Sequence, residues 1–475
     1  MLFNSFNFLV VFPFIFFLFW LIPSKWISVR KWWLIIVSYL LYMKWNASYA
    51  LVLLFVTAIT YWGAYFVENK GKKKRQRLVA VFTILTITPL LVFKYYNFIN
   101  DSASEVVGKI GLHFSLAGLN WAIPIGISFY TFQALGYMLD VYYGRISREK
   151  CFTNYVLFCS FFPQTASGPI SKASELLPQI KVIHPFRYEQ VRTGLQILLW
   201  GMFLKVVMAD RLGIYVDTVY NNYIHYSGFT CFLASIFYSF QIYGDFAGYS
   251  LMAVGIGKCL GYDLVNNFQR PYLATSITDF WKRWHISLTR WLTLYVYIPL
   301  GGSRCSRYRH YWNIIVTFLV SGLWHGANWT FVVWGGLHGI LQVIEKALGI
   351  DPKGKYAKAP FMKRLGIVRI LVTFILVNFC WIFFRTPTIK DAWGYISKIF
   401  TCATGLSQPI QYIPVVALIF IMLIGKEVME EFFPNRFSFF NHSNIVVRWT
   451  SYLFVVMLIV LYGVLDATQF IYVSF

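Results

Sequence analysis

Long apolar runs separated by short polar stretches extend along the whole chain. A helix of about 20 apolar residues crosses the hydrocarbon core of a bilayer, so each run is a candidate membrane span. The runs lie near residues 8–23, 32–43, 49–66, 78–94, 121–140, 153–170, 188–209, 229–243, 312–345, 368–384, 411–425 and 447–465. Some are too short to span alone, so we expect roughly ten to twelve crossings and a few re-entrant or interfacial pieces. The pattern predicts an all-α polytopic membrane protein.

The composition supports this class. Of 475 residues, 58% are hydrophobic and only 13% are charged, whereas about a quarter of the residues of a soluble domain are charged. The first run could be mistaken for a signal peptide. It lacks a basic start and a small-residue cleavage site, so we interpret it as a retained helix.

The net charge is 42 − 19 = +23. In a soluble protein this excess would suggest nucleic-acid binding, but in a membrane protein basic loops set the orientation of the helices, and we expect no nucleic-acid partner. Basic residues gather at Lys25–Lys31, Lys70–Arg77, Gly144–Lys150, Arg304–Tyr311 and Asp351–Arg364. The first three of these loops follow the first, third and fifth runs. This alternation predicts that the basic loops lie in the cytosol and that the N-terminus is extracytoplasmic. The membrane we expect is the inner, cytoplasmic membrane of the cell.

Residues 1–475 show no internal repeat and no low-complexity linker, which predicts one membrane domain. Its middle part, about 121–346, differs from the flanks because polar residues are embedded in apolar sequence. Seven cysteines are scattered without a CxxC pair, and no HxxxH or HExxH pattern occurs. We therefore expect neither a disulfide framework nor a metal site.

The embedded polar residues identify where chemistry could take place. Gln241 and Asp245 lie among aromatic residues in "QIYGDFAGYS". The stretch 266–304 mixes Arg270, His285 and other charged residues with tryptophans. Such side chains are costly against lipid and usually face a bundle interior or a cavity. Interfacial anchoring remains an alternative for each tryptophan, and we expect one or two amphipathic helices here.

His325 lies within a run that is otherwise suited to lipid, next to Gly322 and Gly326. Burial keeps an imidazole neutral, and a neutral imidazole can act as a general base. A hydrogen-bonded core histidine would give the same pattern, so both interpretations stay open. On an unbroken helix, His338 would lie about 20 Å further along the axis, which favours a supporting role. His285 belongs to another element and could converge on His325 in space.

Seven motifs, taken together and in order, resemble the membrane-bound O-acyltransferase family. They are "PIGISFYTFQALGYMLDVYYG" (Pro124–Gly144), "FFPQTASGPI" (Phe161–Ile170), "KVVMADRL" (Lys205–Leu212), "QIYGDFAGYS" (Gln241–Ser250), "NFQRPYLATSITDFWKRWHISLTRWL" (Asn267–Leu292), "YIPLGGSR" (Tyr297–Arg304) and "SGLWHGANWTFVVWGGLHG" (Ser321–Gly339). The branch they resemble contains the alginate O-acetylation membrane protein and the D-alanyl transfer protein of teichoic acid synthesis. The chain departs from the family pattern at Thr293, Leu294, Gly244 and Leu251.

The resemblance implies a bundle of helices around a central funnel or tunnel, with His325 as the invariant histidine and His285 as its partner, both catalytic. It also implies substrate-binding roles for Trp284, Trp324, Asn328, Gln241, Asp245 and Arg270. No cofactor is expected to stay bound.

The activity implied is transfer of an acyl group, acetyl by preference. The expected donor is a cytosolic thioester, either acetyl-CoA or an acyl carrier protein. The expected acceptor is a hydroxyl of an envelope polysaccharide or exopolysaccharide, reached directly or through an extracytoplasmic partner transferase. D-alanyl transfer is the nearest alternative. A transporter or flippase, or a scaffold of an export complex, are alternatives of another class.

Overall fold

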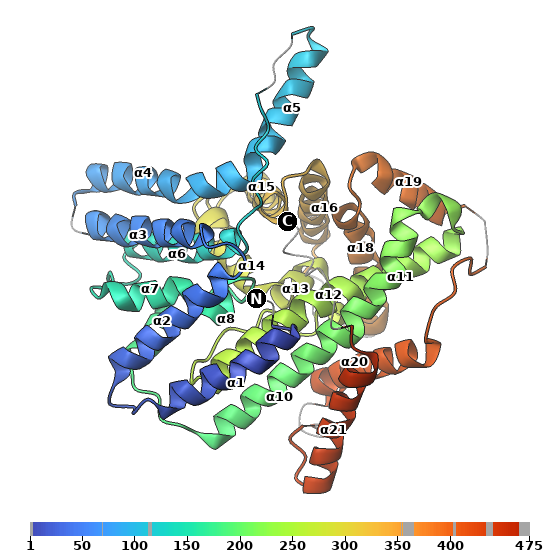
Figure 1. Cartoon of the computed structure of the whole chain (residues 1–475). Helices are drawn as coiled ribbons and strands as arrows, with labels where there is room; N and C mark the ends of the chain where they lie inside the picture. Colours follow the sequence, from blue (N-terminus) through green and yellow to red (C-terminus); the bar gives the residue numbers. More distant parts are fainter. Residues whose placement is uncertain are drawn as a thin grey trace. The chain divides into compact units, whose positions relative to one another are not determined.

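The computed structural model describes residues 3–68, 70–112, 116–352, 354, 365–401, 405–433 and 440–464. Helices and their connections account for these ranges, which contain no β-strand (Figure 1). The predicted all-α class is confirmed. Contacts group the chain into two compact units, 1–195 with 253–265 and 196–252 with 266–475, and the boundaries fall inside or just beyond two long helices. The prediction of a single domain stays a prediction.

In the first unit, several helices pack around α3. Its helices are α1 (Phe6–Leu21), α2 (Ile27–Met43), α3 (Tyr49–Glu68), α4 (Lys72–Leu90), η1 (Leu91–Tyr95), α5 (Tyr96–Lys109), α6 (Ile127–Tyr142), α7 (Phe152–Ser160), α8 (Phe162–Thr165), α9 (Ala173–Lys181) and the first part of α10 (Tyr188–Met202). Helices α4, α6 and α7 each contact α3, and Figure 1 shows them side by side. Nearly all of α6 is buried, because its neighbours cover it on several sides.

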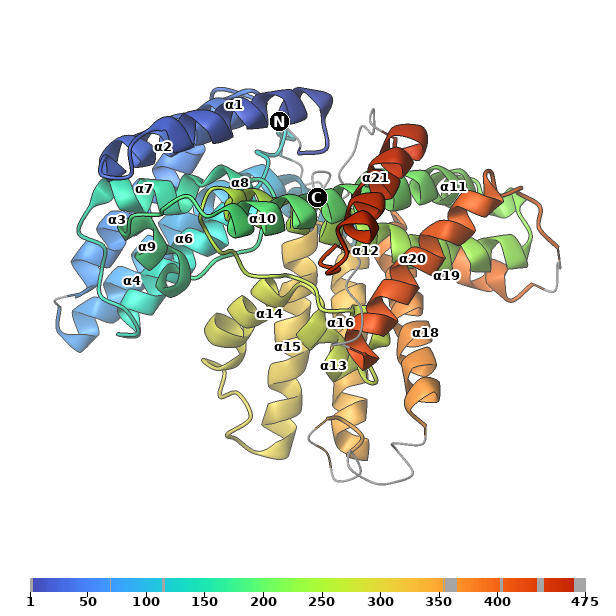
Figure 2. The ribbon, with the colours of Figure 1, turned by 90° about the horizontal axis from the view of Figure 1, so that it is seen from below.

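The second unit carries the motifs that contain histidine. Its helices are the last part of α10, η2 (Phe203–Ala209), α11 (Asp210–Asn221), η3 (Tyr223–His225), α12 (Gly228–Cys259) up to residue 252, η4 (Pro271–Leu273), α13 (Ile277–Arg283), α14 (Ile286–Leu292), η5 (Thr293–Tyr297), α15 (Arg307–His325), α16 (Trp329–Leu348), α18 (Gly366–Arg385), α19 (Ile389–Ile399), α20 (Ile413–Phe432) and α21 (Ile445–Tyr462). Helix α16 packs between α15 and α18, and the three are drawn as neighbouring rods in Figure 2. The short helix α13 contacts α16 and α18.

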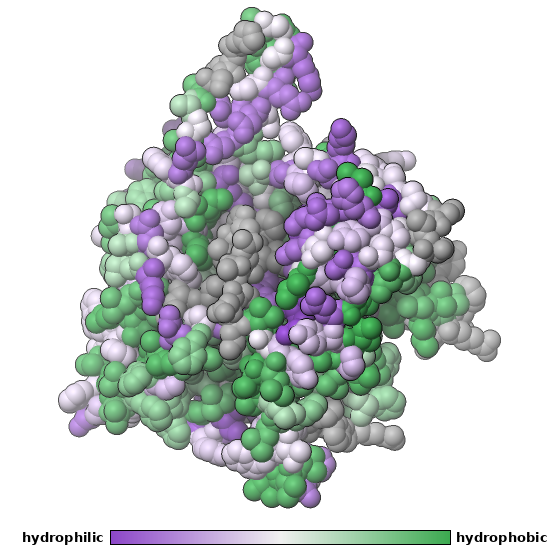
Figure 3. All heavy atoms as spheres, turned by 45° about the vertical axis from the view of Figure 1, so that its right-hand side comes forward, coloured by the Kyte–Doolittle hydropathy of each residue, from purple (hydrophilic) through white to green (hydrophobic). Residues whose placement is uncertain are grey.

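Four helical stretches among the described residues are long and apolar enough to cross a membrane: Tyr49–Glu68, Lys72–Lys109, Gly366–Arg385 and Ile445–Tyr462. Large apolar side chains such as Phe14, Ile375 and Val460 are more than half exposed. Hydrophobic residues also cover much of the face drawn in Figure 3. These surfaces suit contact with lipid tails better than contact with water. The predicted total of ten to twelve crossings stays a prediction.

Two of the predicted apolar runs are interrupted rather than continuous. Phe161 separates α7 from α8 within the run 153–170, and residues 326–328 separate α15 from α16 within the run 312–345. The second break follows His325 directly: Gly326 is extended, and the side chain of Asn328 accepts a hydrogen bond from the Thr330 N–H (2.9 Å) to begin α16. The expected separation of His325 and His338 assumed an unbroken helix, and this assumption was wrong.

Glycines on either side of this break allow the backbones of α15 and α16 to approach each other closely. A Cβ atom on Gly322 would lie 2.2 Å from the backbone oxygen of Phe331, and one on Gly335 would lie 2.3 Å from the oxygen of Phe318. Only a residue without a side chain fits such contacts between two backbones. The paired glycines thus bring α15, and the histidine at its end, against the first two turns of α16.

Candidate active site

Two histidines from separate elements meet inside the second unit. His325 is the last residue of α15, and His285 lies at the junction between α13 and α14. Their ring centroids are 6.3 Å apart, and the two residues are 2% and 0% exposed. Burial lowers the pKa of the His285 imidazole well below its usual range, so this ring is uncharged near neutral pH. The convergence that the sequence left open is present in the structure.

Aromatic rings surround this pair of imidazoles. Trp324 contacts both, at 5.0 Å from His325 and 5.7 Å from His285 between ring centroids. Phe246 of α12 packs edge-on against His285 at 4.6 Å. Trp334 of α16 and Phe384 of α18 pack against His325 at 4.9 and 5.4 Å. Such an enclosure excludes water, which strengthens every electrostatic interaction within it.

The segment that carries His285 folds back on itself through backbone hydrogen bonds. The N–H of Gln269 donates to the carbonyl of Arg283 (2.9 Å), and the N–H of Ile286 donates to the carbonyl of Asn267 (3.0 Å). His285 itself has φ +43° and ψ +53°, which is the left-handed region. A non-glycine residue keeps this conformation only where its surroundings impose it. The closed segment is the element that imposes it here.

Helix α16 holds α13, the helix before His285, at two points. The carboxylate of Glu345 accepts hydrogen bonds from the Ile277 and Thr278 N–H groups (2.5 and 3.0 Å), which satisfies donors at the start of α13. One turn further, the Trp281 indole N–H donates to Nδ1 of His338 (3.2 Å). His338 is fully buried and therefore supports α13 from the side.

The other residues expected to bind substrate are found in different settings. Trp284 is fully buried and packs on Phe268 and Trp381, and its indole N–H has no hydrogen-bond partner among the described residues. Asn328 caps α16 and also donates to the carbonyl of Pro387 (2.8 Å). Trp324 is the member of this set whose ring packs against both imidazoles.

Asp245 forms part of a buried ion cluster. Its carboxylate lies 2.5 Å from the ammonium of Lys205, which also contacts Asp210 at 2.6 Å. Lys205 is 1% exposed, and both carboxylates are buried. Gln241 lies one turn earlier on α12, where its side-chain amide faces Gly213. These groups serve the packing of η2 and α11 against α12, next to Phe246 and the imidazole it contacts.

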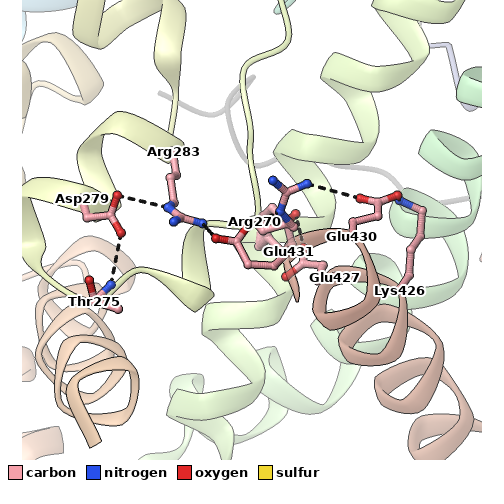
Figure 4. Close-up of polar contacts among 9 residues, drawn as sticks. Arg270, Thr275, Asp279, Arg283, Lys426, Glu427, Glu430 and Glu431 are labelled. Atoms are coloured by element: carbon pink, nitrogen blue, oxygen red, sulfur yellow. Dashed lines mark hydrogen bonds and ion pairs between the residues drawn. The ribbon is translucent and has the colours of Figure 1, made fainter. Parts of the chain in front are cut away.

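Arg270 belongs to a second charged cluster, drawn in Figure 4. Its Nε donates to Glu431 of α20 (2.6 Å), and its Nη1 lies 3.6 Å from Glu430. Glu431 also binds Arg283 (2.9 Å), which in turn contacts Asp279 (3.2 Å). The charge of Arg270 is thus directed to the C-terminal end of α20.

A cavity of about 560 Å³ lies along α15, and its lining includes Leu288 and Ser321, each within about one turn of a histidine, but neither His285 nor His325 itself. Its wall combines apolar side chains with three basic groups and one carboxylate: Trp281, Leu288, Leu292, Ile314 and Phe318, with Lys282, His310, Lys346 and Asp351. Asp351 lies 3.5 Å from the ammonium of Lys346. His310 and Ser321 both line it from α15, so it follows that helix for about 16 Å. Ser321 lies one turn before His325, and its buried hydroxyl has no hydrogen-bond partner among the described residues.

Sequence reasoning missed Lys205, Glu345 and Glu431 as groups that organise the site. The first two had a visible signal, because each is an ionisable residue within or at the end of an apolar run. Glu431 had none, since an acidic residue after an apolar run is ordinary. The cavity could not be found from the sequence, because its wall combines residues from five elements.

Long apolar helices, a buried pair of imidazoles and a cavity along α15 are features of a membrane-embedded enzyme. Residues 3–385 match the membrane-bound O-acyltransferase family, and the chain belongs to this family. It is 35% identical over 374 residues to the "Probable alginate O-acetylase AlgI" of Pseudomonas aeruginosa, covering 78% of this chain and 70% of that protein.

The names of two further relatives describe the transfer of different acyl groups. A peptidoglycan O-acetyltransferase of Helicobacter pylori is 34% identical over 76% of this chain and 72% of that protein. A teichoic acid D-alanyltransferase of Streptococcus thermophilus is more distant, at 26% identity over 73% of this chain and 85% of that protein. The chain is a membrane-embedded O-acyltransferase, as the motifs predicted.

Proposed function

We propose that the protein transfers an acetyl group from a cytosolic thioester to a hydroxyl of an envelope polysaccharide or exopolysaccharide, with His325 as the general base. The observation that carries this proposal is the pair of imidazoles 6.3 Å apart inside an aromatic enclosure. An alcohol is a weak nucleophile at neutral pH and needs a base within hydrogen-bond reach. Relatives that are 34–35% identical carry names of O-acetylases, which favours acetyl over D-alanyl.

In the proposed reaction the acyl group passes from the thioester to the acceptor hydroxyl without a covalent enzyme intermediate. His325 takes the proton of the acceptor hydroxyl while the oxygen attacks the thioester carbonyl, so that a C–O bond forms. The tetrahedral intermediate collapses, the C–S bond breaks, and the leaving thiolate takes the proton from His325. An N–H of His285, or the nearby indole N–H of Trp284, stabilises the oxyanion. The aromatic enclosure excludes water, which would otherwise hydrolyse the acyl group.

The cavity along α15 supports a site for the thioester donor. Coenzyme A and the phosphopantetheine arm of a carrier protein both join a negatively charged phosphate to a long, weakly polar arm. The ammonium groups of Lys282 and Lys346 suit the phosphate, which would replace Asp351 as the partner of Lys346, and the apolar wall suits the arm. Ser321 lines the cavity one helical turn before His325 and suits the acyl end. Acetyl-CoA is the donor we propose, and a carrier protein is the alternative.

The acceptor would approach from the extracytoplasmic side, where the N-terminus is also proposed to lie. No long hydrophilic stretch occurs in the sequence. We therefore propose a second route, in which a serine or tyrosine hydroxyl of a separate extracytoplasmic transferase accepts the acetyl group at His325 and this partner then acetylates the polymer. Purified protein reconstituted in vesicles with acetyl-CoA and glycan tests this point directly. Acetyl glycan formed by this chain alone would remove the need for the partner.

The test of the activity compares envelope glycans by mass spectrometry. Cells that produce His325→Ala should lose the acetyl groups that wild-type cells add, while the variant stays in the membrane at normal amounts. His225→Ala is the matched control, because His225 is an exposed histidine of the same unit. Unchanged acetylation in His325→Ala would refute the proposed base. A lost D-alanyl signal would instead select the alternative acyl group, and lost solute uptake would select a transporter.

The donor site has its own test. Lys346→Ala should raise the KM for acetyl-CoA about tenfold and leave kcat within twofold, because the lysine is proposed to bind a phosphate remote from the reacting carbonyl. Lys390→Ala, an exposed lysine of α19 outside the cavity wall, should leave both constants unchanged. Equal KM values for the two variants would place the donor elsewhere.

A further inference from the structure

A single carboxylate on α20 joins the two ends of the stretch that precedes His285. Oε2 of Glu431 lies 2.6 Å from Nε of Arg270, and Oε1 lies 2.9 Å from Nη1 of Arg283 (Figure 4). Each oxygen therefore serves a different arginine. Residues 270–283 between these arginines contain η4 and α13, and Arg283 is two residues before His285.

Other contacts place this carboxylate where it can control the geometry of the stretch. The backbone bond from Gln269 to Arg283 (2.9 Å) closes the same ends from the inside, and Asp279 fixes Arg283 from a third direction (3.2 Å). Glu431 is 19% exposed and the side chains of Arg270 and Arg283 are 31% and 20% exposed, so solvent screens these ion pairs only in part. Hydrogen bonds between ionised groups are also the stronger kind.

We propose that Glu431 is a positioning residue: by holding Arg270 and Arg283 together it fixes the backbone of His285 and keeps its imidazole beside that of His325. This rests on the proposed role of His285 in the reaction. His285 has a left-handed backbone that its surroundings must impose. We call the three residues Arg270, Glu431 and Arg283 the clamp. Its carboxylate comes from α20, which lies beyond residues 3–385 that match the family. The C-terminal part of the chain thereby takes part in catalysis without touching substrate.

The first test compares two neighbouring glutamates that lose the same charge. Glu431→Gln should lower kcat about tenfold and leave the KM for acetyl-CoA within twofold, because an oxyanion donor that is out of place weakens the transition state more than the ground state. Glu430→Gln is the matched control. Glu430 is 43% exposed, is paired with Lys426 and reaches Arg270 only at 3.6 Å. Its variant should keep wild-type constants. Equal kcat values for the two variants would overturn the clamp.

A double-variant cycle tests whether the effect passes through His285. In a His285→Asn background, Glu431→Gln should lower the residual rate by less than twofold, since the positioned group is already absent. A tenfold loss in both backgrounds, or a Glu431→Gln variant whose thermal midpoint and membrane amount fall with its rate, would show general damage and overturn the proposal. If His285→Asn alone leaves the rate unchanged, the proposed role of His285 fails instead, which separates the two ideas.

Arg270→Gln removes the other partner of Glu431. Arg270 is farther from His285 in the chain than Arg283 is. The variant should give the same loss of kcat as Glu431→Gln, and the double variant should be no slower than either single variant, because one link can be broken only once. Losses that multiply in the double variant would mean that the two residues act separately, against a shared clamp.

Discussion

The close approach of α15 and α16 at Gly322 makes the position of His325 sensitive to one methyl group. In Gly322→Ala the new Cβ would lie 2.2 Å from the Phe331 backbone oxygen, whereas ordinary contact begins at 3.4 Å. The helices must therefore separate locally by about 1.2 Å (3.4 − 2.2). His325 follows three residues later and moves with this turn. A misplacement of about 1 Å at a reacting group costs about a hundredfold in rate, which corresponds to about 2.7 kcal/mol in the barrier.

The same substitution should cost less in stability than in rate, with a net loss of about 0–2 kcal/mol. Overpacking of a tight contact costs about 1–3 kcal/mol, and the better helix propensity of alanine returns about 1 kcal/mol of it. The variant should therefore still fold and insert, with a lower thermal midpoint than the wild-type protein.

The assay is the rate of acetyl transfer per amount of protein in the membrane, together with the thermal midpoint in detergent. Gly336→Ala is the control within the same helix pair, because its Cβ would meet only the end of the Leu319 side chain at an ordinary 3.5 Å. It should keep its rate within twofold. Full activity in Gly322→Ala would mean that the backbone contact does not fix His325, and the reasoning from rigid packing would fail.

Three further variants or conditions test the supporting groups. Lys205→Met leaves the buried carboxylate of Asp245 without its cation, and should cost about 3–5 kcal/mol by thermal denaturation in detergent. Lys258→Met breaks an exposed pair and should cost less than about 1 kcal/mol; equal losses would contradict the argument. Glu345→Gln should lower the rate with little loss of protein, since it weakens the cap of α13; an unchanged rate would refute that role. Because burial lowers the pKa of His285, the folded state excludes a proton that the unfolded state takes up below about pH 6.5. Stability should therefore fall on acidification, by about 1.4 kcal/mol per pH unit, with a shallower slope in His285→Asn; identical slopes would contradict it.

Hydrophobic patterning predicted the positions of most helices because long apolar runs have few alternatives to a helix in a membrane. The runs 49–66 and 368–384 correspond closely to α3 and α18. Patterning could not show the break after His325, because Gly326 and its small neighbours are also common inside membrane helices. The break depends on the extended Gly326 and the cap at Asn328, which are local backbone features.

The histidines were identified from the motifs, and their meeting at 6.3 Å required the fold. His285 and His325 are 40 residues apart on different elements, and spacing alone cannot bring such residues together. The partners of Arg270 and Asp245 were equally hidden, since Glu431 and Lys205 are 161 and 40 residues away in the chain. Polar residues in an apolar segment indicate that they are satisfied somewhere, but the sequence does not say by which group.

The left-handed backbone of His285 changes how its replacements should be interpreted. Histidine and asparagine adopt that region far more readily than alanine does. An alanine variant would pay for an unfavourable main chain as well as lose its ring, and its defect would exaggerate the worth of the imidazole. Asparagine removes the ring while tolerating the same main-chain angles. The difference in rate between the alanine and asparagine variants therefore measures how much the backbone conformation of residue 285 contributes to catalysis.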